Sequence, residues 1–207
     1  MTAAPTPRRS ARKAKGDGHL RRGEILEAAG RIFLAHGHEG ATMRRIAEAA
    51  GVSSTALYKH FPDKDAILQE ICQQTLGELI ARNLEIAARP AGAEQRVLAM
   101  LEAYIRWGLS HPKAYSLVYV SPTGPGMWSE RTTDLSRRAY EIYRDVVREI
   151  AEAGRLRAGD ADTVAQATWM ACHGMVALLI ARPGFDWAST DALIATMLET
   201  LSGGLAT

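Results

Sequence analysis

The sequence predicts an all-α protein of about nine helices. Apolar residues recur at every third or fourth position through most of the 207 residues, which is the spacing of one buried helix face. The 18 glycines and 8 prolines gather between these periodic segments, where turns are expected. No segment alternates apolar and polar residues as a half-buried strand does. With 47% hydrophobic and 23% charged residues, the composition is typical of a soluble globular protein of one or two domains.

The first 19 residues differ from the rest of the chain. They show no hydrophobic period, and five basic side chains lie among Ala, Pro, Ser and Gly: Arg8, Arg9, Arg12, Lys13 and Lys15. This composition predicts a disordered basic tail at residues 1–19. Such a tail either serves solubility or adds contacts to a nucleic-acid backbone, and both interpretations stay open.

Charge is distributed unevenly along the chain. Residues 1–65 carry 12 Lys and Arg against 7 Asp and Glu, whereas the remaining 142 residues carry 13 against 16. A basic head on a mildly acidic body is typical of proteins that bind a polyanion.

Three helices are predicted within residues 20–66. The first carries an apolar stripe that ends at Gly37, and the second begins at Thr42, whose hydroxyl can cap it. A tight break at Gly51 separates the second helix from the third, which ends before Pro62.

The second and third of these helices indicate a helix-turn-helix. Two short helices joined by so tight a turn cross at a large angle, and the second helix of such a pair enters the major groove of DNA. Gly51 suits the turn because a glycine adopts a left-handed backbone conformation without steric cost. The outward residues of the third helix form hydrogen bonds and none is acidic: Ser54, Thr55, Tyr58, Lys59 and His60. The pattern therefore predicts a domain that binds double-stranded DNA.

Residues 67–207 are predicted to form a second, helical domain. A long helix at about 64–88 leads into it and carries a wide apolar stripe, as expected of a connector. Five further helices are predicted, at about 93–110, 111–120, 130–153, 160–181 and 189–202.

The stretch from Ile25 to Leu68, with ATMRRIAEAAGVSSTALYKHFPDKDAIL at its centre, closely resembles the DNA-binding domain of the TetR family of regulators. The resemblance implies a homodimer that binds a pseudo-palindromic operator. It also implies DNA-contacting roles for nine residues: Thr42, Tyr58, His60 and Lys64 at phosphates, Ser54, Thr55 and Ala56 at base edges, and Arg44 and Lys59 at bases or the backbone.

The same resemblance implies that the last two helices pair with their copies in the dimer. Eight residues of their apolar stripes are candidates for this interface: Val164, Thr168, Ala171, Met175, Leu179, Leu193, Met197 and Leu201. In addition, Trp169-x-x-x-His173-Gly174 resembles the Trp-His-Gly subgroup of TetR-like C-terminal domains. The Trp and His side chains either pack in the core or line a pocket, and both interpretations stay open.

The C-terminal domain is expected to bind a small effector that releases the protein from DNA. Small-ligand pockets have apolar and aromatic walls with a few polar groups. The candidate wall residues are Tyr104, Trp107, His111, Tyr115, Trp128, Tyr140, Trp169 and His173. Because few charged residues fall in apolar segments, a hydrophobic or aromatic effector is expected rather than a sugar phosphate or nucleotide.

Three other classes of function share some of these sequence features. An activator, or a DNA-binding protein without an effector, has the same sequence features. An enzyme would need a nucleophile or paired carboxylates beside His173 and His111, and no such motif is present. A metal sensor built from His36, His38, Cys172 or His173 matches no standard spacing, so no metal or cofactor is expected.

The chain is expected to be cytoplasmic. No apolar stretch precedes Ile25, so no signal peptide is predicted. The longest uninterrupted apolar run, Met175 to Ala181, is too short to span a bilayer, and no membrane partner is expected. Cys72 and Cys172 fall in apolar helical patterns and are expected to be reduced, packed thiols.

Overall fold

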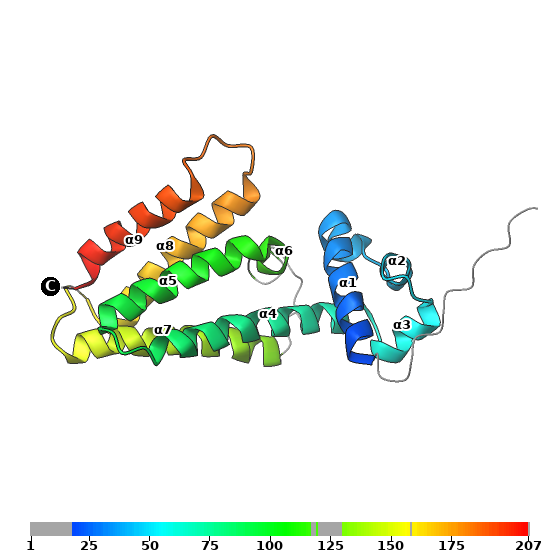
Figure 1. Cartoon of the computed structure of the whole chain (residues 1–207), viewed down its shortest axis with the longest axis horizontal. Helices are drawn as coiled ribbons and strands as arrows, with labels where there is room; N and C mark the ends of the chain where they lie inside the picture. The colour runs from blue at the N-terminus through cyan, green and yellow to red at the C-terminus, as the bar shows by residue number, and fades with distance from the viewer. Residues whose placement is uncertain (1–17, 117–118, 120–129, 158, 207) are drawn as a thin grey trace, which may run out of the picture. The chain divides into compact units, whose positions relative to one another are not determined.

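The computed structural model describes residues 18–116, 119, 130–157 and 159–206 (Figure 1). Every regular element in these ranges is a helix, and a single isolated bridge pairs Leu156 with Ala206, so the predicted all-α class is confirmed. The helices are α1 (Gly18–Gly40), α2 (Met43–Ala49), α3 (Ser54–His60), α4 (Lys64–Ala87), α5 (Ala93–Ser110), α6 (Pro112–Tyr115), α7 (Glu130–Glu152), α8 (Ala161–Ala181) and α9 (Thr190–Leu205).

The chain divides into two compact units. The first extends through Lys64 and the second begins at Asp65, so the division lies two residues before the predicted boundary at 66/67. Because α4 begins at Lys64, the two units are joined in sequence by one uninterrupted helix.

In the N-terminal unit, α1 packs on α2 and α2 on α3. Ile25 and Phe33 of α1 and Ile46 of α2 are fully buried, which accounts for the apolar stripes in the sequence. At Gly37 the backbone leaves the helical conformation with φ of +65°, a value that glycine adopts freely. The predicted end of the first helix therefore appears as a break in α1, and one short turn follows it.

The C-terminal unit is built around α5, which packs against α7, α8 and α9. The indole Nε1 of Trp107 donates to the carbonyl oxygen of Thr75 (3.2 Å) and so joins α5 to α4 inside the core. Helix α5 also approaches α8 closely at Gly108. A Cβ at this position would lie 2.7 Å from a methyl carbon of Val176, so the close packing requires a glycine.

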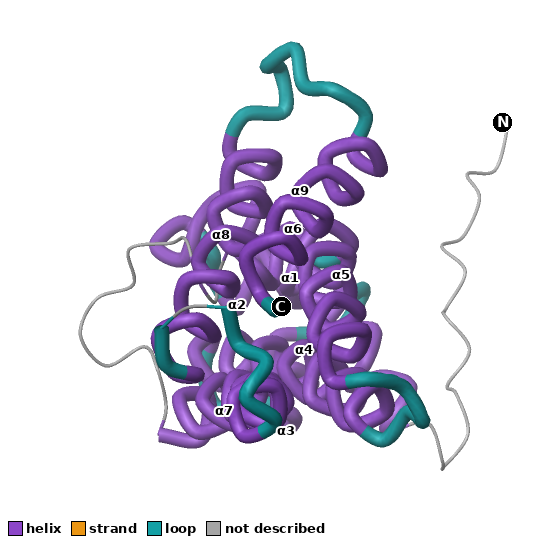
Figure 2. The backbone as a smooth tube through the Cα atoms, turned by 90° about the vertical axis from the view of Figure 1, so that its left-hand side faces the viewer, coloured by secondary structure: helices purple, strands orange, loops and turns teal. Residues whose placement is uncertain are grey.

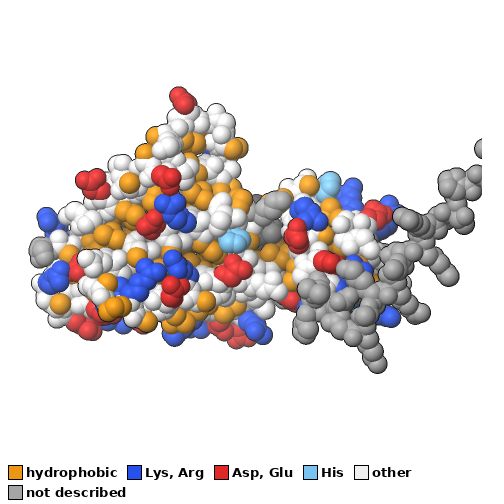
Figure 3. All heavy atoms as spheres, in the orientation of Figure 1, with side chains coloured by type: hydrophobic (Ala, Val, Ile, Leu, Met, Phe, Trp, Pro, Cys, Tyr) orange, Lys and Arg blue, Asp and Glu red, His pale blue; other side chains and the backbone are white. Residues whose placement is uncertain are grey.

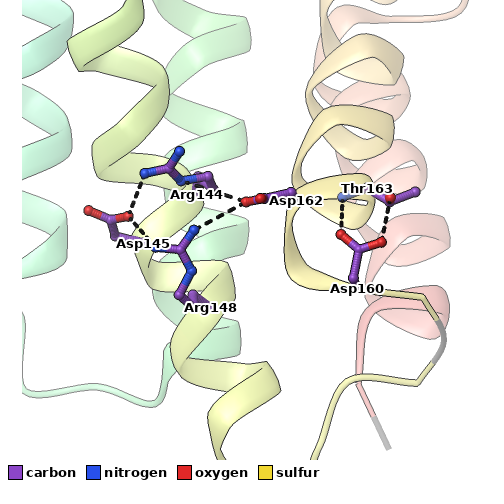
Figure 4. A network of polar contacts seen from close by, with 6 residues as sticks. All are labelled: Arg144, Asp145, Arg148, Asp160, Asp162 and Thr163. Atoms are coloured by element: carbon purple, nitrogen blue, oxygen red, sulfur yellow. Dashed lines mark hydrogen bonds and ion pairs between the residues drawn. The ribbon is translucent and has the colours of Figure 1, made fainter.

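The connection from α7 to α8 is ordered by polar contacts (Figure 4). Arg144 and Arg148 of α7 both reach the carboxylate of Asp162, with N–O distances of 3.7 and 3.3 Å. Asp160 accepts hydrogen bonds from the backbone NH and the hydroxyl of Thr163 (2.9 and 2.7 Å) and thereby caps α8. Because the ion pairs are largely exposed, they orient the two helices more than they stabilise them.

Helices α8 and α9 form a helical hairpin whose connecting loop spans 182–189 (Figures 1 and 2). By length and composition, α8 is apolar enough to cross a membrane. The sequence did not predict this, because its longest uninterrupted apolar run, Met175 to Ala181, is short. Only 22% of its most apolar 18-residue window is buried within the chain. Hydrophobic side chains are accordingly exposed over this part of the unit (Figure 3), among them Met170 and Leu178. A single chain thus leaves much of the apolar surface of α8 uncovered.

Candidate functional site

The turn between α2 and α3 has the geometry of a helix-turn-helix. Thr42 caps α2, with its hydroxyl oxygen accepting a hydrogen bond from the NH of Arg45 (3.3 Å). Gly51 adopts φ of +63°, as the sequence predicted, and Val52 NH then donates back to the carbonyl of Ala47 (2.9 Å). These contacts satisfy the helix ends locally, so the turn is short and α3 leaves it in a fixed direction.

Helix α3 presents one buried and one exposed face. Leu57 is fully buried, and Ser53 caps the helix by accepting a hydrogen bond from the NH of Ala56 (3.1 Å). Four of the five residues predicted to face outward are exposed, and the fifth, His60, is half-buried. Among the expected DNA contacts on this helix, Ser54, Thr55, Tyr58 and Lys59 are exposed, whereas Ala56 and His60 are half-buried. Within its own unit this face is polar and cationic.

The remaining predicted DNA contacts lie at the edges of this face. Thr42 and Arg44 are exposed, and Arg44 forms an exposed ion pair with Glu48 (3.5 Å). Lys64 is half-buried, and its ammonium donates to the carbonyl oxygen of His38 near the end of α1 (2.8 Å). Lys64 thus has an intramolecular partner that the sequence did not predict.

Arg22 is a positioning residue that the sequence analysis missed. Its guanidinium lies over the ring of Phe61, 4.1 Å from the centroid, and Nη1 donates to the carbonyl oxygen of His60 (2.9 Å). Arg22 therefore holds the end of α3 against α1. An arginine on the polar side of the first helix gives no sequence signal for this contact.

The C-terminal unit contains a cavity of about 340 Å³ between α4, α5, α7 and α8. This volume is at the lower end of the range for small-ligand pockets. The wall is formed by Leu79, Asn83, Met100, Leu101, Tyr104, Tyr119, Ser136, Arg137, Ala139, Tyr140, Tyr143, Gln166 and Trp169. Five of these are aromatic, and none carries a carboxylate.

Three of the predicted ligand-binding residues line this cavity: Tyr104, Tyr140 and Trp169. Trp107, Tyr115 and His173 instead form an aromatic cluster behind Tyr104, with Tyr115 and His173 ring centroids 5.4 Å apart. His111 does not line the cavity but lies at the edge of this cluster, with its ring centroid 6.2 Å from that of Trp107 and its Nε2 3.4 Å from the carboxylate of Glu78. Trp128 lies outside the described residues.

Two tyrosines converge on His173 behind the cavity. The imidazole Nδ1 lies 2.6 Å from the Tyr115 hydroxyl and 2.9 Å from the Tyr104 hydroxyl. Burial raises the pKa of both tyrosines, so both hydroxyls stay protonated and can donate. Burial also lowers the pKa of His173, which favours the neutral imidazole. In the tautomer with its proton on Nε2, the single lone pair of Nδ1 accepts a hydrogen bond from one of the two hydroxyls.

The sequence analysis also missed several wall residues. Tyr119 follows Tyr115 by four positions, and the two rings lie 5.1 Å apart, so helical spacing was a usable signal. Asn83 and Gln166 gave none, because a polar residue within an apolar helix pattern looks like part of the solvent-exposed face.

The predicted dimer residues occupy different depths. Thr168 and Met175 are buried inside the chain, and Thr168 forms a hydrogen bond with the Tyr143 hydroxyl (2.5 Å). Val164, Ala171, Leu179, Leu193, Met197 and Leu201 are half-buried. The uncovered face of α8 shares Ala171 with this prediction and follows a stripe at helical spacing: Ala167, Met170, Ala171, Gly174 and Leu178. Periodicity could not distinguish the two faces because both are apolar.

The cysteines and histidines show no arrangement for metal chemistry in the described ranges. No group of three or more His, Cys, Asp and Glu side chains is placed there to hold an ion. Cys72 and Cys172 are buried free thiols, and burial raises their pKa to about 11 and about 12. Neither thiol is activated as a nucleophile at neutral pH.

Two family models match the chain. Residues 25–71 match the model of bacterial regulatory proteins of the tetR family, and residues 97–201 match the tetracyclin repressor-like C-terminal domain. Together they include the helix-turn-helix and most of the cavity wall. The resemblance to the Trp-His-Gly subgroup stays a prediction.

Individual proteins agree with these models. The HTH-type transcriptional repressor KstR2 of Mycobacterium tuberculosis H37Rv is 28% identical over 148 residues, which cover 70% of this chain and 74% of KstR2. The HTH-type transcriptional activator FasR of Mycolicibacterium smegmatis is 30% identical over 99 residues, covering 48% of this chain and 45% of FasR.

A solved structure shows the same fold. The TetR family regulator PfmR of Thermus thermophilus superposes with a TM-score of 0.73 at 24% identity, covering 90% of this chain and 97% of PfmR. These matches point to a regulator of transcription rather than to an enzyme. The chain therefore belongs to the TetR family and is a DNA-binding regulator of transcription.

Proposed function

We propose that this protein is a cytoplasmic, homodimeric repressor of nearby genes that a small apolar or aromatic effector releases from its operator. The observation that carries the proposal is the exposed, acid-free face of α3, held by the Gly51 turn beside Arg44. Such a face suits the major groove, where hydrogen-bond donors read base edges and cations meet phosphates.

The residues of this face are expected to make two kinds of DNA contact: phosphate contacts that position the helix and base contacts that recognise the sequence. Ser54, Thr55 and Ala56 are small and offer single hydrogen bonds or a methyl contact rather than bidentate pairing. Specificity is therefore expected to depend on Arg44, Lys59 and DNA shape. Tyr58 offers its hydroxyl to a phosphate, which carries no sequence information.

The dimer is supported by the uncovered stripe on α8. Exposed apolar surface of this extent favours association, and a second copy of the same helix hairpin provides a matching surface. One recognition helix contacts few phosphates, whereas two copies on successive major grooves, about 34–36 Å or a multiple apart, bind together.

The release step is supported by the position of the cavity. Leu79 and Asn83, on α4, form part of the wall, and α4 continues in sequence to Lys64 at the end of the DNA-binding unit. An effector that binds the DNA-free form more tightly shifts the population, and a change from 99:1 to 1:99 needs about 5.5 kcal/mol of preference.

The repressor name of KstR2 supports repression, and the activator name of FasR supports activation as a second candidate. A reporter gene behind the bound operator distinguishes them. Deletion of the regulator raises expression if it represses and lowers expression if it activates.

The DNA-binding surface is tested by two substitutions on α3. We expect Tyr58→Phe to weaken binding to all duplexes by a similar factor, on the order of tenfold, because a lost phosphate contact is independent of sequence. Lys59→Met is expected to change the order of preference among operator variants. Gel-shift titrations over a set of single-base variants measure both effects.

Glu27→Gln on the exposed side of α1 serves as a control, since its carboxylate pairs with Arg31 on the same helix. It should leave operator affinity unchanged. If neither α3 substitution alters DNA binding, the roles assigned to this face are wrong.

A further inference from the structure

Two polar side chains of the cavity wall, Asn83 and Tyr140, each carry a buried polar atom without a hydrogen-bond partner among the described residues, and Asn83 is the more deeply buried. Asn83 lines the cavity from α4, one helical turn after Leu79, and is only 5% exposed. Its neighbours in the wall include Leu79 on the same helix and Ala139 and Tyr143 on α7. A buried polar group normally has its hydrogen bonds satisfied, so the partners of this carboxamide are informative.

Only one end of the Asn83 carboxamide has a partner among the described residues. Nδ2 donates to the backbone carbonyl of Ala139 (3.2 Å). A carbonyl oxygen can only accept, so this contact fixes which end of the amide is nitrogen and which is oxygen. The other end is therefore Oδ1, a hydrogen-bond acceptor that is shut off from solvent and has no partner in the part of the chain that the structure describes.

An acceptor left without a donor in a buried wall destabilises the empty protein. A leucine at this position would fill a similar volume without that cost, and it would suit the apolar faces of α4 and α7. A ligand that supplies a donor to Oδ1 satisfies this acceptor when it binds. The free energy that the unpaired acceptor costs the empty protein is then partly recovered as binding affinity.

Resting on the effector-controlled function proposed above, we propose that the cavity takes an uncharged, largely aromatic molecule that carries a hydroxyl or N–H donor for Asn83 Oδ1. The five aromatic wall residues and the absence of a wall carboxylate among the described residues match an uncharged body, and the cationic wall residue Arg137 is exposed and paired with Asp134. Asn83 is the specificity-determining residue, because it distinguishes this molecule from the same skeleton without the donor.

The experiment uses matched pairs of probes that differ in one donor: 4-phenylphenol with 4-methoxybiphenyl, and 2-naphthol with 2-methoxynaphthalene. Isothermal titration calorimetry measures the Kd of each with the full chain. We expect the wild type to bind the hydroxyl member of at least one pair about tenfold more tightly than its methyl ether. Asn83→Leu should remove this preference by weakening the phenol and strengthening the ether.

Asn83→Ala is a second variant in case the leucine is not accommodated, and it should lose the same preference. Gln74→Leu is the matched control on α4, since Gln74 is exposed and bonds to Glu70 on its own helix. This control should retain the preference of the wild type.

The outcomes separate the two proposals. Equal affinity of the wild type for both members of each pair, retention of the preference in both Asn83 variants, or no binding of any probe overturns the assignment to Asn83. If the preference is present and depends on Asn83, but saturating phenol leaves operator binding unchanged, the assignment stands and effector release is wrong.

Discussion

At the scale of single residues, burial changes how readily the histidine behind the cavity is protonated. The tertiary structure brings two tyrosine hydroxyls, from α5 and α6, within hydrogen-bond distance of His173 Nδ1. The sequence placed Trp169 and His173 one turn apart, and their ring centroids lie 5.6 Å apart. It could not place Tyr104 and Tyr115 beside them, because those contacts join residues 69 and 58 positions apart.

The burial of His173 predicts a pH dependence of stability. Its pKa in the folded chain lies below the ordinary 6.5, so the unfolded chain binds the proton more readily. The contribution of this group is therefore fully present above about pH 6.5 and decreases as the pH falls toward the lowered folded-state pKa. The variant His173→Asn keeps an acceptor near Nδ1 but does not titrate. As the pH is lowered, we expect its free energy of unfolding to fall less than that of the wild type.

Urea unfolding between about pH 7.5 and 5.5 measures the difference between the two proteins, and other titrating groups cancel in it. Parallel curves for the wild type and the variant would contradict the prediction.

At the scale of elements, helices were easier to predict than the cavity between them. Both ends of α5 were predicted at the observed residues, and the ends of α7 and α8 within one, because caps and turn residues are local signals. The sixth helix was predicted at 111–120, but α6 ends at Tyr115, and Ser116 and Tyr119 lie in a wider, π-type turn. The cavity is space left by packing, and no local pattern encodes such space.

The crossing of α5 and α8 makes a prediction at this scale. A Cβ on Gly108 would lie 2.7 Å from Val176 Cγ1 and 3.0 Å from Tyr115 Cδ2. We therefore expect Gly108→Ala to destabilise the protein by about 1–3 kcal/mol, since the core must shift to accept a methyl group.

Gly77→Ala on α4 is the control, because a Cβ there meets no atom within 4 Å. It should stabilise the protein by up to about 1 kcal/mol through helix propensity. Chemical unfolding of both variants gives the comparison, and a Gly108→Ala protein at least as stable as the wild type would show that the crossing is not tight.

At the scale of the whole molecule, the uncovered face of α8 is the proposed interface between two chains. The sequence indicated that α8 is apolar on most of its circumference. It did not show which face of α8 packs against other helices of the same chain and which face stays exposed. Leu178 is 53% exposed on the uncovered stripe, whereas Thr168 faces Tyr143 in the core.

Substitutions on this stripe test the proposed dimer. We expect Leu178→Glu to shift the protein to monomers and to lower operator affinity at least about tenfold, because a buried unpaired carboxylate opposes association. Leu84→Glu on α4 introduces the same charge at a site that is 47% exposed and should remain dimeric. Analytical ultracentrifugation measures both, and a dimeric Leu178→Glu protein would exclude this face as the interface.

The contact between Lys64 and His38 joins the proposed phosphate contact of Lys64 to the end of α1. An ammonium has three N–H donors, so Lys64 can keep the His38 carbonyl and still face a phosphate. Replacing Lys64 with an uncharged residue removes both contacts at once, and the loss of affinity in such a variant exceeds the worth of the phosphate contact alone. The phosphate contact is isolated by the slope of log affinity against log salt concentration, because this slope reports the number of counterions released from DNA. The comparison is between the slopes of the wild type and of the Lys64 variant.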